Sequence, residues 1–192
     1  MNDIRKNYIP KDVDKRKVPL WYVLYVRSRF EKKVAKELEE RKIEYFLPLI
    51  PRLRYWKDRR KIVAMPLFPG YIFVHIKLAD EVNVVSIDGV AWLISFLNKP
   101  SPIPESQITD VKKLLIYPER VENIDYIKDG CMVEILYGPF AGIQGKLVEH
   151  RGKRRLVVGI DLINQALSVE VEMDQVKMIR NTPSPRPNLN IS

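Results

Sequence analysis

The most strongly patterned strand lies at residues 66–76, with the sequence PLFPGYIFVHI. Two prolines and a glycine interrupt the chain just before an apolar, aromatic run, and side chains of a strand alternate between its two faces. One face is aliphatic and is expected to be core: Ile72, Val74 and Ile76. The other face, which Phe68 joins from the turn, is either core or a docking patch: Tyr71, Phe73 and His75.

Two predicted elements precede this strand. Residues 21–26 (WYVLYV) form a short aromatic and β-branched run, which is typical of a buried strand. From Phe30 to Leu38 apolar residues recur at helical spacing, with charged residues between them. Ser28 and Glu31 have the spacing of a capping box. The pattern predicts an amphipathic helix of about three or four turns.

Strands are predicted between this helix and residues 66–76. Residues 45–51 form one apolar run, and residues 53–64 carry a basic stretch that predicts a long hairpin. Its tip is expected near Lys57, Asp58 and Arg59.

Three elements are predicted after residues 66–76. Residues 80–87 are compatible with a short helix, residues 90–97 predict a strand, and Pro104 opens a helix that Pro118 ends. This order predicts an α+β domain over residues 20–116, with a mainly antiparallel sheet and flanking helices.

The second half of the chain has a different pattern. Its short β-prone runs recur about every ten residues, which predicts a small β-barrel over residues 127–180. The runs are 132–136, 146–149, 156–160, 167–172 and 176–179. The polar segment 117–126 is the best linker candidate. Residues 1–19 and 181–192 are polar and contain several prolines, so both are predicted to be disordered tails.

Charge and composition narrow the class of partner. The chain has 33 Lys and Arg against 24 Asp and Glu, a net charge of +9. This excess favours an anionic partner, nucleic acid first. The alternative is a solvated basic surface that only keeps the protein soluble, and charge alone does not decide between them. The single cysteine, Cys131, is predicted to be buried in a strand and suits a reducing compartment. Neither a membrane span nor a signal peptide is predicted, which favours a soluble, cytoplasmic protein without a membrane partner.

The residue types that catalysis requires are scarce. His75 and His150 are the only histidines and fall in different predicted domains, with Cys131 as the only thiol. Spacings typical of zinc ligands and glycine-rich phosphate loops are missing from the sequence. We therefore predict no catalytic residue, no metal site, no cofactor and no enzymatic activity; an enzyme with a cryptic site would lack every motif tested.

The basic hairpin is the strongest nucleic-acid candidate. Its cations are Arg52, Arg54, Lys57, Arg59, Arg60 and Lys61. Such residues can contact phosphates, and Tyr55 or Trp56 could stack on an unpaired base. The alternative is a solvated hairpin whose charges protect an edge strand. Phosphate contact is favoured over that alternative. Base stacking is disfavoured, because Tyr55 and Trp56 alternate and one is expected to face a sheet.

Two other groups of cations were weighed. Residues around the first helix are expected to extend the basic surface of the hairpin: Arg27, Lys33 and Lys36. A second basic tip, HRGKRR at residues 150–155, is equally compatible with a solvated turn and with an RNA or protein contact.

Several motifs together resemble a known family. WYVLYV, PLFPGYIFV and GVAWLISF followed by KPSPIP resemble the N-terminal (NGN) domain of the NusG family of transcription elongation factors. GCMVEILYGPFAGIQGKLVE, at residues 130–149, resembles a KOW motif. The resemblance covers residues 20–180 and implies an NGN domain joined to a small SH3-like β-barrel.

The resemblance also implies partners. In this family the first domain binds the clamp coiled coil of the largest RNA polymerase subunit and limits pausing. The polymerase-binding patch would be Tyr25, Phe68, Tyr71, Phe73, Leu93 and Phe96. The barrel typically contacts a small-subunit ribosomal protein or Rho, here through Pro139, Phe140, Ile143 and Ile163. Non-template or upstream DNA is the expected nucleic acid, and the protein is expected to be a monomer.

Within the family, the chain is most similar to operon-specific paralogues of the RfaH and UpxY type. The histidine–threonine motif by which RfaH-type proteins touch the polymerase gate loop is missing, and residues 81–87 (EVNVVSI) occupy its region. The β-branched runs favour a constitutive barrel over one that refolds into helices.

The functional hypothesis from the sequence is an antitermination factor for specific long operons. Its alternatives are a housekeeping NusG-type factor and a ribosome-associated RNA-binding KOW protein.

Overall fold

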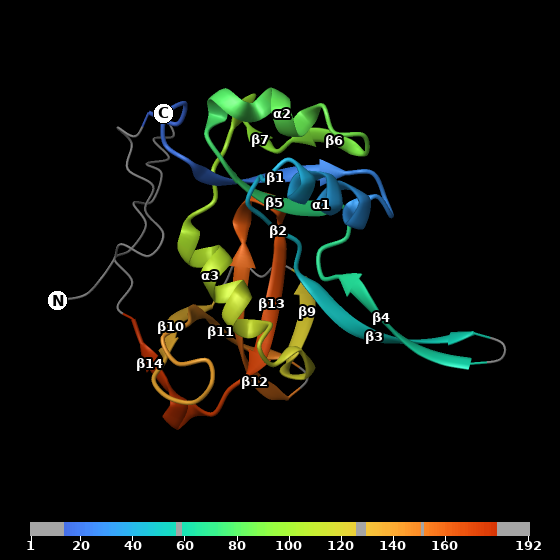
Figure 1. Ribbon diagram of the computed structural model, residues 1–192. Helices are drawn as coiled ribbons and strands as arrows, with labels where there is room; N and C mark the ends of the chain where they lie inside the picture. The colour runs from blue at the N-terminus through green and yellow to red at the C-terminus, as the bar shows by residue number, and fades with distance from the viewer. Residues whose placement is uncertain (1–13, 57–58, 126–129, 151, 180–192) are drawn as a thin grey trace, which may run out of the picture.

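The computed structural model describes residues 14–56, 59–125, 130–150 and 152–179 (Figure 1). They form two larger antiparallel sheets, two small two-stranded sheets and short helices. The C-terminal tail predicted at 181–192, most of the N-terminal tail and the hairpin tip at Lys57 and Asp58 lie outside the described residues.

The first sheet confirms the predicted antiparallel arrangement. Its strands, in spatial order, are β2 (Tyr45–Phe46), β5 (Tyr71–Ile76), β1 (Leu20–Val26) and β6 (Val90–Leu93). The central pair β1 and β5 runs in continuous register from Leu20 opposite Ile76 to Tyr25 opposite Tyr71. The strand predicted at residues 90–97 is divided in the structure, because β6 ends at Leu93 and a separate short strand follows.

The aliphatic face of β5 is core, as predicted. Ile72, Val74 and Ile76 are buried in one cluster with Val34 and Leu38. The last two residues belong to the predicted amphipathic helix, α1 (Glu31–Glu40). The short predicted helix is also present, as η2 (Leu78–Asp80) followed by α2 (Glu81–Val85). The face of the sheet that carries Ile72 is therefore closed by α1 and α2.

The start of α1 differs from the predicted capping box. Phe30 occupies the N-cap position and no side chain caps the helix. Arg29 has a φ of 70°, so the chain reverses between Ser28 and the first helical turn. The Glu31 carboxylate instead accepts a 2.9 Å hydrogen bond from the backbone N–H of Gly70, and Glu31 is buried. This bond ties the first turn of α1 to the loop before β5.

The opposite face of the sheet is covered by α3 (Glu105–Leu114), which then runs alongside the second sheet (Figure 1). The apolar positions of α3 are buried: Ile108, Val111 and Leu114. The Ile103 N–H, just before the helix, donates a 2.7 Å hydrogen bond to the carbonyl of Trp21. Lys112 Nζ of α3 lies 5.0 Å from the centre of the Trp21 ring, which places α3 against the start of β1.

The second sheet contains all five predicted strands of the C-terminal half and one more. In spatial order the strands are β14 (Val176–Met178), β10 (Cys131–Ile135), β11 (Gln144–His150), β12 (Lys153–Ile160), β13 (Gln165–Glu170) and β9 (Val121–Asp125). Three short 3-10 helices lie along this part of the chain: η3 (Pro118–Arg120), η4 (Asp161–Ile163) and η5 (Met173–Gln175). Within the described residues no ladder joins the edge strands β14 and β9. The closed SH3-like barrel thus stays a prediction.

The segment predicted as a linker, 117–126, contributes η3 and strand β9. β9 pairs with β13 from Val121 opposite Val169 to Asp125 opposite Gln165. Its polar composition concealed this strand, because the pairing uses backbone groups and the Glu122 and Asn123 side chains remain exposed.

The predicted basic hairpin is present as β3 (Leu49–Trp56) and β4 (Arg59–Pro66). The two strands pair over their whole length and extend away from the rest of the protein (Figure 1). A second, much shorter hairpin joins β7 (Ser95–Phe96) to β8 (Lys99–Pro100). None of the described helices is long and apolar enough to cross a membrane.

Gly145 offers a test of the packing between β11 and β12. A Cβ atom at this position would overlap the Val157 carbonyl oxygen and lie 3.1 Å from Leu156 Cγ. Because backbone cannot move aside cheaply, Gly145→Ala should lower the free energy of unfolding by about 1–3 kcal/mol. Denaturant unfolding measures this, with Glu149→Ala at an exposed site of the same strand as the control. Equal stability of the two variants would contradict the packing described here.

Candidate interaction surfaces

The residues predicted to bind polymerase do not form one exposed patch. Phe68 and Phe73 are fully buried, with ring centres 6.1 Å apart. Leu93 is also buried, but in the other cluster, on the α1 side of the sheet. Phe96 is 66% exposed in the β7–β8 hairpin. Side chains alternate between the two faces of a strand, and Leu93 points to the face opposite the one that carries Phe73. Leu93 therefore lies in a different cluster from Phe68 and Phe73.

Three aromatic side chains do meet at one end of the first sheet. Tyr25 stacks on Trp92, with ring centres 4.5 Å apart, and meets Tyr71 edge-on at 5.6 Å. Cross-strand register brings them together, because Tyr25 is opposite Tyr71 on one side and Trp92 on the other. Trp92 is 54% exposed, and both tyrosines are half-buried. We call these three residues the aromatic row.

Sequence reasoning missed Trp92. It selected the neighbouring Leu93, although the alternation that grouped Tyr71 with Phe73 also applies to β6. Once β6 is paired with β1, Trp92 must share the face of Tyr25. Trp92 can be identified only when the pairing of β6 with β1 is known, and the sequence of a single strand does not specify its partner.

One buried apolar cluster joins the two sheets. It includes Phe68 and Phe73 from the first sheet and its preceding turn, and Ile108 and Val111 from α3. It also includes three of the residues predicted to bind a barrel partner: Phe140, Ile143 and Ile163. The contact is reinforced where the Asn123 side-chain amide of β9 donates a 3.1 Å hydrogen bond to the Leu67 carbonyl. Five of the residues predicted to bind two different partners thus lie in the same interior: Phe68, Phe73, Phe140, Ile143 and Ile163.

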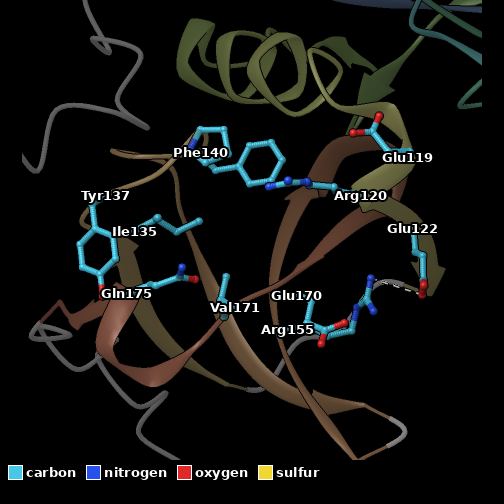
Figure 2. Close-up of a pocket in the computed structure, with 11 residues that line it drawn as sticks. Glu119, Arg120, Glu122, Ile135, Tyr137, Phe140, Arg155, Glu170, Val171 and Gln175 are labelled. Carbon is cyan, nitrogen blue, oxygen red and sulfur yellow. Dashed lines mark ion pairs between the residues drawn. The ribbon is translucent and has the colours of Figure 1, made fainter.

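The fourth predicted barrel contact, Pro139, is exposed and lines a cavity of about 320 Å³ (Figure 2). Phe140 lies at one end of this cavity, and the buried Arg155 lies towards the other. Arg155 Nε donates a 2.8 Å hydrogen bond to Ser168 Oγ, and its Nη2 lies 3.3 Å from Glu122 Oε2. Arg155 therefore links β9, β12 and β13, and its charge is balanced within the protein.

Tyr137 stands on the rim of the same cavity. Its hydrogen bond to the Asp174 carboxylate raises the pKa of the Tyr137 phenol above its ordinary value. In this contact the phenol donates and the carboxylate accepts.

The basic residues also divide into two groups. In the hairpin, Arg52, Arg54, Arg60 and Lys61 are exposed. Around the first helix, Arg27 and Lys33 both form ion pairs with Asp88, and Lys33 Nζ lies 2.6 Å from Asp88 Oδ2. Lys36 pairs with Glu40 at 3.5 Å. The predicted extension of the basic surface is thus partly neutralised, whereas these four hairpin cations form no ion pair with another described residue.

Of the side chains considered for catalysis, His75 lies in β5 and Cys131 in β10. Within the residues described, no group of three or more His, Cys, Asp or Glu side chains could hold a metal ion. His75 Nδ1 lies 2.7 Å from Glu44 Oε2, and the ring stacks on Trp21. Cys131 is exposed, contrary to prediction, because it begins β10 beyond the buried positions Val133 and Ile135.

Comparisons with known proteins agree with the motifs. The family model described as "Transcription termination factor nusG" matches residues 19–112. The transcription termination/antitermination protein NusG of Staphylococcus carnosus and that of Staphylococcus aureus are each 27% identical over 174 residues. Each match covers 83% of this chain and 95% of the relative. A solved structure of Thermotoga maritima NusG, described as showing domain interaction, has 26% identity and a TM-score of 0.46, covering 84% of this chain and 98% of that one.

The shared ion pair predicts a measurable titration. The hydrogen bond from Lys33, together with the charges of Lys33 and Arg27, holds the pKa of the Asp88 carboxyl below its ordinary value. A lowered folded-state pKa means that the pair stabilises the fold above the ordinary carboxyl pKa. That stabilisation is lost as pH falls through the lower folded value. Lys33→Met should raise the Asp88 midpoint in an NMR titration, whereas Lys36→Met should not. Identical midpoints in all three proteins would contradict the pairing.

Proposed function

We infer that this chain is a member of the NusG family and acts as a transcription termination/antitermination factor. The observation that carries this conclusion is the family match over residues 19–112, which spans the first sheet and most of α3. The NusG relatives are aligned over 95% of their own length, so the similarity extends into the second sheet.

We propose that the aromatic row is the part of the first sheet that binds RNA polymerase. Interface energy is concentrated in a few aromatic anchors, and Tyr25, Tyr71 and Trp92 are held in place by their mutual stacking. They are accessible in this conformation. The clamp coiled coil, which the family resemblance names, is the proposed partner surface.

Phe68 and Phe73 have a different part in this proposal. Burying a side chain of this size stabilises the fold by about 1.5–3 kcal/mol, so exposing both would cost about 3–6 kcal/mol. In this conformation they support the aromatic row from inside. Any contact through them, or through Phe140, Ile143 and Ile163, first requires the two sheets to separate. Contact of the second sheet with Rho or a ribosomal protein is proposed on the same condition.

The hairpin is the proposed nucleic-acid contact. Its described cations extend away from the body of the protein, where a phosphate backbone could approach them without desolvating the rest of the surface. Non-template or upstream DNA is the proposed ligand, because both run close to a factor that is bound to transcribing polymerase.

The specialised role on long operons is proposed only from the resemblance to RfaH- and UpxY-type motifs, since the relatives described above carry the name NusG. A general factor should act on any template, whereas a specialised one should act only on templates with its own operon leader. A ribosome-associated role would show itself as salt-sensitive binding to free rRNA without polymerase.

Transcription through a terminator tests the proposed function directly. Purified polymerase, with and without the full chain, is expected to give different fractions of readthrough product. The template is varied between an unrelated operon and the leader of the chain's own operon, which separates the general from the specialised role. Unchanged readthrough and pausing on every template would refute the proposal.

The aromatic row predicts a loss of polymerase affinity on truncation. Tyr71→Ala and Trp92→Ala should each weaken binding by roughly fivefold or more, because truncation of a hot-spot residue costs above about 1 kcal/mol. Binding to immobilised polymerase measures this, after thermal unfolding confirms that each variant folds. Val82→Ala is the matched control, since Val82 is an exposed apolar residue of α2 on the other side of the sheet. Undiminished binding by both row variants would exclude the row as the contact.

A further inference from the structure

We propose that the β3–β4 hairpin binds single-stranded nucleic acid, with unpaired bases on one face of the hairpin and phosphates on its cations. The inference rests on the nucleic-acid contact proposed above. It adds the class of strand and the residues that would meet the bases.

The pairing register sorts the hairpin side chains onto two faces. Residues directly opposite each other share a face, and Leu53 is opposite Ile62 while Tyr55 is opposite Arg60. These four side chains therefore lie together, because Leu53 and Tyr55 are two residues apart. The other face carries Arg52, opposite Val63, and Arg54, opposite Lys61. One face thus carries Leu53, Tyr55 and Ile62 with a single cation, Arg60, and is called the apolar face. The other carries three cations with Val63 and is called the cationic face.

The apolar face is exposed to solvent. Leu53 is 48% exposed, and Tyr55 and Ile62 are each 68% exposed. Tyr55 does not face either larger sheet, because the hairpin extends beyond both of them (Figure 1). The side chain of Trp56 lies outside the described part of the structure, so the expectation that one of the two aromatics faces a sheet stays a prediction. An isolated two-stranded ribbon with a bare apolar face is marginal in water, so this face is suited to a partner.

Tyr55 has the features of a stacking platform. The Arg60 guanidinium lies 5.3 Å from the centre of the Tyr55 ring, a cation–π contact that restricts the orientation of the ring. A base stacked beside Tyr55 would carry its phosphate close to the same guanidinium. Leu53 and Ile62 extend the flat apolar surface along the ribbon for a neighbouring base.

Charge selects nucleic acid as the occupant of this face. The hairpin side chains that the structure describes include four cations and no carboxylate, since Asp58 lies outside the described residues. A duplex could contact only the cations through its phosphates, because the planar faces of its bases are stacked on one another inside the double helix. A single strand offers both phosphates and accessible base faces, and so matches both faces of the hairpin.

The test is fluorescence anisotropy with the full chain and labelled oligonucleotides of equal length and mixed sequence. The probes are single-stranded DNA, single-stranded RNA and duplex DNA, each over a series of salt concentrations. The variants are Tyr55→Ala, the matched control Tyr55→Phe, and Lys61→Gln on the cationic face.

The native protein should bind single strands more tightly than the duplex. Tyr55→Ala should weaken single-strand binding roughly 5- to 150-fold, with Tyr55→Phe close to the native protein and duplex binding unchanged. Lys61→Gln should weaken all three complexes and reduce the salt slope by about one. A preference for DNA or for RNA identifies the strand and supports the proposal.

Equal binding of duplex and single strands, or an unchanged affinity of Tyr55→Ala for single strands, overturns the proposal. If the protein binds none of the three probes, the proposal is overturned as well. That result would also refute the proposed contact between the hairpin cations and phosphates. The role as a transcription factor is judged separately, because the terminator assay requires no binding to free oligonucleotides.

Discussion

Burial of both faces of β1 and β5 is the constraint on which the rest of the structure depends. The aliphatic face of β5 packs against α1 and the aromatic face belongs to the cluster that continues through α3 into the second sheet. Neither face is left as an open surface over the middle of the sheet. The Glu31–Gly70 hydrogen bond adds a polar tie at one end of this arrangement. The position of the second sheet therefore follows from the need to cover Phe68 and Phe73.

This burial decides what is left for partners. At the end of β1 and β5 the covering elements stop, and the aromatic row remains accessible. Between β2 and β5 the chain makes the long excursion of the β3–β4 hairpin, whose apolar face has no covering element among the described residues. The two surfaces differ in character. The aromatic row is backed by a packed core, whereas the hairpin is supported only by its own ladder.

Sequence reasoning predicted the kinds of element well and their partners less well. Alternation and helical spacing identified α1, β5, the basic hairpin and the five predicted strands of the C-terminal half. β9 was missed, because an edge strand held by backbone bonds needs no apolar pattern. The capping box failed because the positive φ of Arg29 cannot be inferred from the spacing of Ser28 and Glu31. Trp92 and the burial of Phe68 depend on contacts between distant segments, which no local pattern specifies.

The hairpin also places charge far from the centre of the protein. Around α1, Arg27 and Lys33 share the Asp88 carboxylate and Lys36 pairs with Glu40, whereas the described side chains of the ribbon place no carboxylate beside its cations. An uneven distribution of this kind contributes to the electric dipole moment of the molecule. In the field of a polyanion this dipole exerts a torque on the protein during diffusion, so that the ribbon turns towards the polyanion before contact. The protein would then approach the polyanion with the ribbon already facing it. Fewer relative orientations would have to be sampled before a productive encounter.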